Sequence, residues 1–304
     1  MSSESSYRGR FAPSPSGPLH FGSIVSAVAS YADAKAHAGE WRVRIDDVDK
    51  TRSVAGADTL ILSTLERLGF EWAGTPTYQS HKHSRYLEII GILLARGEAF
   101  HCACSRTEIR ALASSHNDTL IYPGTCRQGL PPGRQGRSVR LRTPNTISAV
   151  TDRFAGNFEQ NLATEVGDFV ILRADGLAAY QLAVVIDDDD EGITHIVRGA
   201  DLLSSTPQQQ LLQTLLGLSR PAYGHTPVVF GEDGRKLSKK DAAHPIVLDE
   251  PLPILLKAWS FLGQEKFDAD NVREFWREAG RIWCPARLPI LPAQQDSASL
   301  QTRS

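Results

Sequence analysis

The feature that most constrains the fold is a proline- and glycine-rich segment near the N-terminus, Pro13-Ser-Pro-Ser-Gly-Pro18. Because proline fixes φ and has no N–H donor, this segment cannot lie within a helix or a central strand. Residues 8–12 before it are short and partly apolar, and residues 20–38 after it place apolar side chains at helical spacing until Gly39. The pattern predicts a strand, a tight loop and a helix, whose first N–H groups and positive dipole end would face an anion.

Strand-like and helix-like segments continue to alternate along the chain. Further strands are predicted at residues 41–45, 169–172, 194–197 and 228–230, and further helices at 55–68, 84–95, 179–186, 207–216 and beyond 251. This rhythm is typical of an α/β protein with a parallel sheet. Residues 100–142 interrupt it with clustered cysteines and a loop rich in glycine, proline and arginine.

These segments predict four parts. We expect two halves of one sheet domain at residues 1–99 and 166–245, with residues 100–165 inserted between them. Residues 246–304 would form a helical extension whose tail is loose after Pro292.

Composition limits the classes of partner. With 41% hydrophobic and 22% charged residues, the chain is an ordinary globular protein, and its net charge of −2 excludes a general polycation. Nucleic acid would therefore have to bind a local basic surface. The N-terminus lacks the apolar core of a signal peptide, and no segment is apolar enough to span a bilayer. We expect a cytoplasmic monomer with no membrane partner.

Two separate loops carry signals for phosphate binding. In the first, His20 could donate a hydrogen bond to a phosphate oxygen, and Gly22 would let a flat base lie against the backbone. The alternative is an ordinary strand–turn–helix corner with a helix-capping histidine. The second is Gly234-Arg-Lys-Leu-Ser-Lys-Lys240, which could wrap a triphosphate or could be a solvated basic turn.

Taken together, the two loops resemble the paired signatures of class I aminoacyl-tRNA synthetases. His20-Phe-Gly-Ser23 resembles the "HIGH" element, with serine in place of the final histidine, and Lys236-Leu-Ser-Lys-Lys240 resembles the "KMSKS" loop. The glutamyl branch is the most similar one. Its motifs are matched by Arg10-Phe-Ala-Pro-Ser-Pro, Arg44-Ile-Asp-Asp47, Tyr78-Gln-Ser80 and Val197-Arg-Gly-Ala-Asp201-Leu-Leu-Ser-Ser-Thr-Pro207.

The resemblance implies a Rossmann nucleotide-binding fold that forms glutamyl-adenylate from L-glutamate and ATP, with Mg²⁺ on the triphosphate. A substrate carboxylate away from water needs a cation, and arginine pairs it best. The implied glutamate-binding residues are Arg10, Phe11, Ala12, Pro13, Ser14, Asp46, Tyr180 and Arg198. The implied ATP-binding residues are His20, Gly22, Ser23 and Lys239, and the implied catalytic residues are Lys239, Lys236 and His20.

One position in the implied glutamate site departs from the family. The family has a glutamate for the substrate ammonium where this chain has Asp46, one methylene shorter. A bridging water, or sharing with Asp47, would then complete the contact. Nearby charges have plainer interpretations: Arg44 and Asp49 as a surface pair, and residues 187–191 as a solvated acidic turn rather than an indirect magnesium contact.

Three clustered cysteines predict a metal site in the inserted segment. In a cytosolic protein, Cys102, Cys104 and Cys126 favour structural Zn²⁺ over a disulfide framework, with three reduced thiols as the alternative. The residues alone leave His101 and His116 as candidates for the fourth ligand. The resemblance implies Tyr122 instead, in the pattern Cys-x-Cys…Tyr-x₃-Cys. A bound zinc would stabilise an acceptor-like subdomain too small for its own core.

Chain length and the cysteine pattern are most similar to the short paralogue family of glutamyl-tRNA synthetases. That resemblance implies transfer of glutamate to queuosine in the anticodon of tRNA(Asp). Two alternatives stay open: a compact glutamyl-tRNA synthetase that charges a 3′ end, and a non-enzymatic regulator that binds tRNA or a metabolite. Five arginines near the insertion are either phosphate contacts or part of a solvated loop. They are Arg127, Arg134, Arg137, Arg140 and Arg142.

Overall fold

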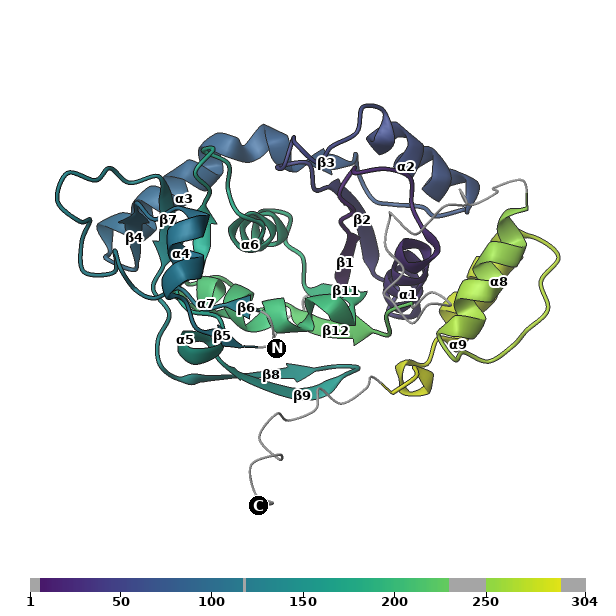
Figure 1. The fold of residues 1–304 in the computed structure, drawn as a ribbon. Helices are drawn as coiled ribbons and strands as arrows, with labels where there is room; N and C mark the ends of the chain where they lie inside the picture. The colour runs from purple at the N-terminus through teal and green to yellow at the C-terminus, as the bar shows by residue number, and fades with distance from the viewer. Residues whose placement is uncertain (1–5, 117–118, 230–249, 291–304) are drawn as a thin grey trace, which may run out of the picture.

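A parallel sheet forms the centre of the computed structural model, which describes residues 6–116, 119–229 and 250–290. Its first half consists of β1 (Arg8–Phe11), β2 (Glu40–Ile45) and β3 (Thr77–Tyr78), in the order β1-β2-β3 and parallel throughout. Its second half is the parallel pair β11 (His195–Gly199) and β12 (Ala222–Thr226). Thr194 donates its N–H to the Arg8 carbonyl at 3.0 Å, so β11 lies beside β1 (Figure 1).

Helix α1 (Phe21–Ala36) is the buried helix behind this sheet. Its alanine-rich sequence lets it pack closely against β1, β2 and β11 on one side and against the C-terminal helices on the other. Gly39 ends the segment, where an added Cβ would lie 2.6 Å from the Tyr7 carbonyl oxygen. The predicted strand–loop–helix corner is confirmed, and the loop from residues 12 to 20 lies at the carboxyl end of β1.

The remaining helices of the sheet domain follow the predicted segments closely. They are α2 (Ala57–Arg67), α3 (His83–Ala95), α6 (Tyr180–Asp190) and α7 (Thr206–Leu216), with 3-10 turns η1 (Gln79–Lys82) and η2 (Ala200–Ser205). The strand predicted at residues 228–230 is wrong for the two of these residues that the structure describes. Val228 and Val229 follow β12 without regular structure, because Pro227 has no N–H with which to extend the pairing beyond Thr226.

The strands of the inserted segment form antiparallel sheets that are separate from the parallel sheet. The segment contains β4 (Ala99–Cys102), α4 (Arg106–Leu112), β5 (Ser115–His116), β6 (Thr119–Leu120), β7 (Ser138–Leu141), β8 (Ile147–Asp152), β9 (Gly156–Asn161) and α5 (Leu162–Glu165). Strands β4 and β7 pair antiparallel, and β10 (Val170–Leu172) joins the other edge of β7. The predicted strand at 169–172 therefore exists, but it pairs with strands of the insertion and not with the parallel sheet.

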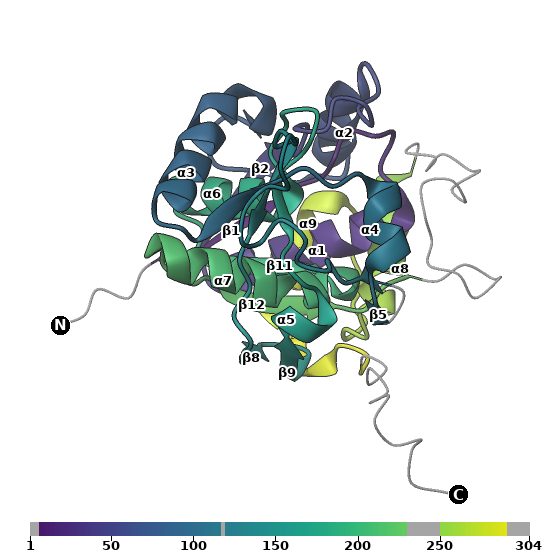
Figure 2. The ribbon, with the colours of Figure 1, turned by 60° about the vertical axis from the view of Figure 1, so that its left-hand side comes forward.

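The hairpin β8–β9 reaches from the insertion back to the sheet domain. It contacts β12 and α7, and lies at the opposite edge of the molecule from α2 (Figure 2). Arg153 at its turn pairs with Asp33 of α1 through both carboxylate oxygens, at 2.7 and 3.1 Å. The hairpin is thereby tied to the far end of the central helix.

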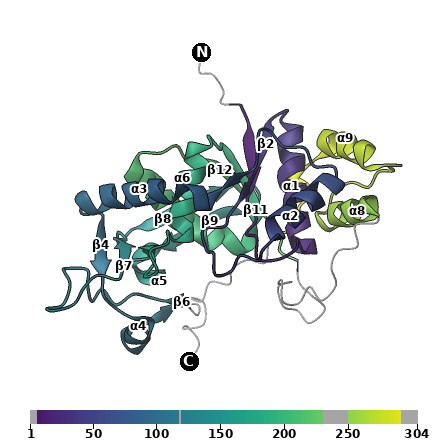
Figure 3. The same cartoon turned by 90° about the horizontal axis from the view of Figure 1, so that it is seen from above.

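The C-terminal helices α8 (Pro251–Phe261) and α9 (Val272–Ile282) pack on α1, with the 3-10 turn η3 (Pro285–Arg287) after them. Trp276 donates its indole N–H to the Leu68 carbonyl at 2.8 Å, and Trp283 donates to Asp33 at 3.0 Å. These helices and the inserted sheet lie at opposite ends of the molecule (Figure 3). In the described ranges, no helix combines the length and apolar character needed to cross a bilayer.

Candidate active site

A pocket of about 350 Å³ opens at the carboxyl ends of β1, β2, β11 and β12. This is where open parallel sheets ordinarily bind ligands. The predicted residues that line it come from five separate segments: Arg10, Phe11, Ala12, Pro13, Ser14, His20, Gly22, Ser23, Asp46, Tyr180 and Arg198. The structure thus brings together every predicted glutamate- and ATP-binding residue that it describes. Arg52, Asp201 and Ser26 also line the pocket and were not predicted.

The start of α1 forms one wall of the pocket. His20 is the N-cap of the helix, and its Nδ1 accepts the Ser23 N–H at 3.2 Å. The helix-capping role that the sequence left open is therefore present, and it faces the pocket. Gly22 lies against this ring: an added Cβ would be 3.2 Å from two His20 ring atoms and 3.7 Å from the Val229 Cβ. A side chain at position 22 would crowd the capping His20 ring and would contact Val229.

Arg10 is held by a buried carboxylate beneath the pocket. Its Nε and Nη2 donate to the two oxygens of Asp188 at 3.1 and 3.3 Å, and only 4% of the residue is exposed. Nη1 takes no part in this bidentate pair. The pair fixes the plane of the guanidinium, which is the preorganisation that an anchor for a substrate carboxylate requires.

Arg44 corrects the sequence interpretation of this region. It is completely buried, not half of a surface pair, and donates to Asp46 at 2.9 Å, Asp188 at 2.8 Å and Glu191 at 3.2 Å. Asp49 instead pairs with Arg173 at 2.7 Å. Removing the Arg44 charge would leave Asp46 buried without this cation and would leave Asp188 with Arg10 alone.

The acidic run at residues 187–191 is likewise not a solvated turn. It forms the end of α6, and Asp187, Asp188 and Glu191 are buried while Asp189 and Asp190 are exposed. Asp187 accepts hydrogen bonds from Gln79 at 2.8 Å and from Tyr86 at 2.9 Å. These carboxylates are occupied by protein donors, so the run is a structural charge network beneath the pocket.

Asp46 is the acidic side chain of this network that reaches the pocket. Burial raises its pKa to about 6, although the adjacent Arg44 guanidinium acts to lower the pKa. Asp47 accepts the N–H and the hydroxyl of Ser80 at 2.8 and 2.7 Å and is not among the residues that line the pocket. The geometry therefore favours Asp46 over Asp47 as the partner of a bound ammonium group.

Arg198 and Tyr180 also line the pocket. Arg198 is 5% exposed and donates Nε to His225 at 3.0 Å and Nη2 to the Thr206 hydroxyl at 2.9 Å. Tyr180, the first residue of α6, is partly exposed. With Arg52 and Asp201 included, three guanidinium groups and two carboxylates of the described residues line the pocket, a charge pattern that complements an acidic amino acid.

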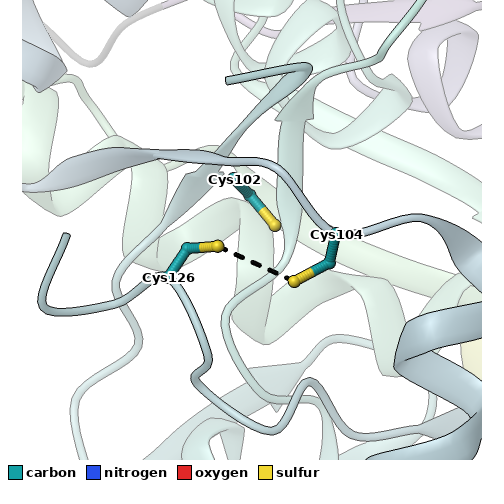
Figure 4. Close-up of side chains that lie close together, drawn as sticks. All are labelled: Cys102, Cys104 and Cys126. Carbon is teal, nitrogen blue, oxygen red and sulfur yellow. Dashed lines mark hydrogen bonds between the residues drawn. The ribbon is translucent and has the colours of Figure 1, made fainter. Parts of the chain in front are cut away.

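The three predicted cysteine ligands converge in the inserted segment (Figure 4). The sulfurs of Cys102, Cys104 and Cys126 all lie within 4.8 Å of one another, and the Cys104–Cys126 separation is 3.7 Å. A tetrahedral ion with metal–sulfur bonds of about 2.3 Å places its sulfurs about 3.8 Å apart. The three thiols therefore have the spacing of a metal site.

The Tyr122 hydroxyl lies beside this group, at 3.4 Å from the Cys102 sulfur and 3.7 Å from the Cys104 sulfur. Arg140 packs over the Tyr122 ring with its guanidinium carbon 4.0 Å from the ring centroid. Neither His101 nor His116 belongs to the cysteine group, and His116 lies 3.5 Å from Glu165. Of the three candidates for a fourth ligand, the geometry favours the tyrosine.

Comparison with known proteins places the chain in a family. Residues 6–250 match the model of the catalytic domain of class I tRNA synthetases of the E and Q type. Glutamyl-Q tRNA(Asp) synthetase of Aromatoleum aromaticum is 52% identical over 286 residues, 93% of this chain and 90% of that protein. Its namesake from Chromobacterium violaceum is 47% identical over 95% of this chain and 97% of that protein. The chain belongs to the glutamyl-Q tRNA(Asp) synthetase family.

Solved structures of related class I synthetases share the fold. A glutamate tRNA ligase from Elizabethkingia meningosepticum, in complex with its amino acid, superposes with a TM-score of 0.77 at 24% identity. The match covers 93% of this chain but 66% of that one, so this member of the glutamyl-Q family spans about two thirds of the larger protein. At this identity the likeness concerns the fold alone.

The second loop signature of the class I synthetases lies outside the described residues. Lys236 and Lys239 fall within 230–249, so their position relative to the pocket stays a prediction. The described chain reaches the pocket on the N-terminal side of this segment, because Pro227, Val228 and Val229 line it.

Most of the five arginines near the insertion are engaged within the protein. Arg127 pairs with Asp168, and Arg134 donates to Glu108 at 2.9 Å. Arg140 is buried against Tyr122, which corrects its assignment as a candidate phosphate contact on the surface. Arg142 lies over the Phe100 ring at 4.9 Å and donates to the Gly97 carbonyl, whereas Arg137 is exposed.

Proposed function

We propose that this chain activates L-glutamate with ATP and transfers the glutamyl group to queuosine in tRNA(Asp). The observation that carries the proposal is a pocket lined by Arg10, Arg198 and Asp46 at the start of α1, in a chain about half identical to glutamyl-Q tRNA(Asp) synthetases over most of its length. The pocket charges fit an amino acid with two carboxylates and one ammonium group.

Each charged group of glutamate has a partner in this assignment. Arg10, oriented by Asp188, binds the side-chain carboxylate, and Asp46 binds the ammonium, either directly or through a water. Arg198 adds a second cation, and Tyr180 closes the side of the pocket. Since Asp46 is held at 2.9 Å from Arg44, it has little freedom to move toward the substrate.

The first chemical step joins an oxygen of the glutamate α-carboxylate to the α-phosphorus of ATP. The bond from that phosphorus to the bridging oxygen breaks, and pyrophosphate leaves with its Mg²⁺. The protein contributes position and charge rather than covalent chemistry. His20, Gly22 and Ser23 hold the nucleotide at the start of α1, and Lys236 and Lys239 stabilise the charge on the leaving pyrophosphate.

In the second step, a hydroxyl oxygen of queuosine attacks the carbonyl carbon of glutamyl-adenylate. The carbon–oxygen bond to the phosphate breaks, AMP leaves and the hydroxyl proton passes to solvent. The anticodon loop would enter the same cleft in this step, with Arg52 exposed at the pocket rim.

We also propose that Cys102, Cys104, Cys126 and Tyr122 hold one structural Zn²⁺. The sulfur spacing and the position of the tyrosine hydroxyl support this assignment. The group lies in the small hydrophobic cluster formed by these residues with Phe100 and Ala103. A cluster of this size gains most of its order from a bound ion.

The test is incubation of the enzyme with radiolabelled glutamate, ATP and three RNAs. These are tRNA(Asp) that contains queuosine, the same tRNA(Asp) without it, and tRNA(Glu). We expect label on the first RNA alone. Label on tRNA(Glu), independent of queuosine, would identify a compact glutamyl-tRNA synthetase. Absence of label, together with absence of glutamate-dependent ATP–pyrophosphate exchange, would identify a binding protein without this activity.

A further inference from the structure

Arg198 donates a hydrogen bond to His225, a buried histidine that has no role in the proposed reaction. Its Nε donates to His225 Nε2 at 3.0 Å, and its Nη2 donates to the Thr206 hydroxyl at 2.9 Å and to the Leu202 carbonyl at 3.3 Å. Nη1 is buried and has no hydrogen-bond partner within the described ranges. Of the described residues that line the pocket, Arg198 is the one with a buried side-chain nitrogen that lacks a hydrogen-bond partner.

This geometry fixes the tautomer of His225. A ring nitrogen that accepts from Arg198 Nε carries no proton, so the proton of the neutral ring is on Nδ1. Nδ1 in turn lies 2.5 Å from Asp152 Oδ2 and donates to it. The other oxygen, Oδ1, accepts the backbone N–H groups of Phe154, Ala155 and His225 at 2.9, 2.8 and 3.0 Å.

The surroundings keep this pair in one charge state. Burial lowers the pKa of His225, and the adjacent Arg198 charge acts in the same direction, against the pull of Asp152. Burial opposes the ionisation of Asp152, but the hydrogen bond and charge of His225 together with the backbone N–H groups of Ala155 and Phe154 outweigh it and lower the pKa of the carboxyl. In this relay the Arg198 guanidinium donates to the neutral His225 imidazole, and the imidazole donates to the Asp152 carboxylate.

We propose that Asp152 and His225 are positioning residues, which hold the Arg198 guanidinium at the pocket so that it pairs with a carboxylate of the bound amino acid. Asp152 ends β8, His225 lies on β12 and Arg198 lies on β11. The hairpin that extends from the inserted segment therefore sets the amino-acid affinity of the pocket. The inference deepens the proposed function, because it takes glutamate as the ligand.

Asp152→Asn tests the relay with a minimal change. The asparagine oxygen can still accept the three backbone N–H groups, but its NH₂ faces His225 as a donor. The neutral imidazole then adopts the tautomer with its proton on Nε2. Its Nε2–H faces the N–H of Arg198 Nε, so the relay breaks without the removal of any side chain. Loss of one charge-assisted hydrogen bond in a buried site weakens glutamate binding by about 10- to 100-fold.

The matched control is Asp168→Asn. Asp168 is also a buried aspartate that accepts a backbone N–H, that of Thr143 at 2.8 Å, and pairs with an arginine, but it does not line the pocket. Glutamate is titrated by calorimetry into each protein in the presence of α,β-methylene-ATP. We expect weaker glutamate binding by Asp152→Asn alone, with the affinity for the ATP analogue unchanged in both variants.

A spectroscopic readout separates positioning from general damage. In ¹⁵N-labelled protein, His225 should show a protonated Nδ1 in the wild type and a protonated Nε2 in Asp152→Asn. A second pair of variants applies even where Asp152→Asn does not fold: His225→Gln offers an oxygen to Arg198, and His225→Leu offers none. The glutamine variant should bind glutamate more tightly than the leucine variant.

Two results would overturn the inference. One is a folded Asp152→Asn variant that binds glutamate as the wild type does. The other is equal glutamate affinity in the two His225 variants. A wild-type protein that binds no glutamate at all would instead defeat the proposed function itself, whatever the tautomer of His225.

Discussion

Asp46 makes a quantitative prediction about glutamate binding at low pH. Burial raises its pKa to about 6, whereas free glutamate keeps a side-chain pKa near its ordinary value of about 4.3. The carboxylate form of Asp46 is the one that attracts the ammonium group. Asp46 is ionised in about nine-tenths of the protein molecules at about pH 7 and in about one-tenth at about pH 5. Acidification over this range should therefore reduce the apparent glutamate affinity about tenfold.

The assay is calorimetric titration of glutamate across this range, with Asp46→Asn as the control. The asparagine variant cannot ionise, so it should bind weakly and with little dependence on pH. Any contribution from His20 or from the ligand would remain in that variant and can be subtracted. A wild-type affinity that stays constant on acidification, or an equal pH dependence in Asp46→Asn, would refute the assignment of Asp46 as the ammonium partner.

Three further variants test other parts of the structure. Arg44→Met should lower the free energy of unfolding in urea by about 3–5 kcal/mol, because it strands buried carboxylates; a change within error would contradict the buried network. Cys126→Ser should contain about one equivalent of zinc less than the wild type by elemental analysis. A purified wild-type protein that contains no zinc would exclude the site. Gly22→Ala should raise the KM for ATP in pyrophosphate exchange more than the KM for glutamate, since its Cβ crowds His20; equal effects would argue against a nucleotide wall there.

Local sequence signals predicted the elements that carry the pocket. The prolines between β1 and α1 and the alanine-rich spacing of α1 are local properties, and the structure has both where they were expected. The same holds for α6 and α7. The strand at 222–226 was missed because Ala-Tyr-Gly-His-Thr has a weak apolar pattern, while the apolar Val228 and Val229 follow a proline that ends the pairing.

Long-range burial explains what the sequence could not predict. Arg44 lies 144 residues from Asp188, and only the fold brings them into contact. The acidic run was misjudged for the same reason, since charges in sequence order do not show which side of α6 faces the core. Asp152 and His225 had no local signal at all: 73 residues separate them, and their role depends on Arg198, which lies on a third strand, β11.

A structure with a glutamyl-adenylate analogue, the non-hydrolysable glutamyl sulfamoyl adenosine, tests the central claim most directly. The account predicts that the ammonium lies beside Asp46, the side-chain carboxylate between Arg10 and Arg198, and the adenosine against Gly22. An analogue bound with its amino acid part away from both arginines, or outside the pocket at the carboxyl ends of the strands, would contradict it.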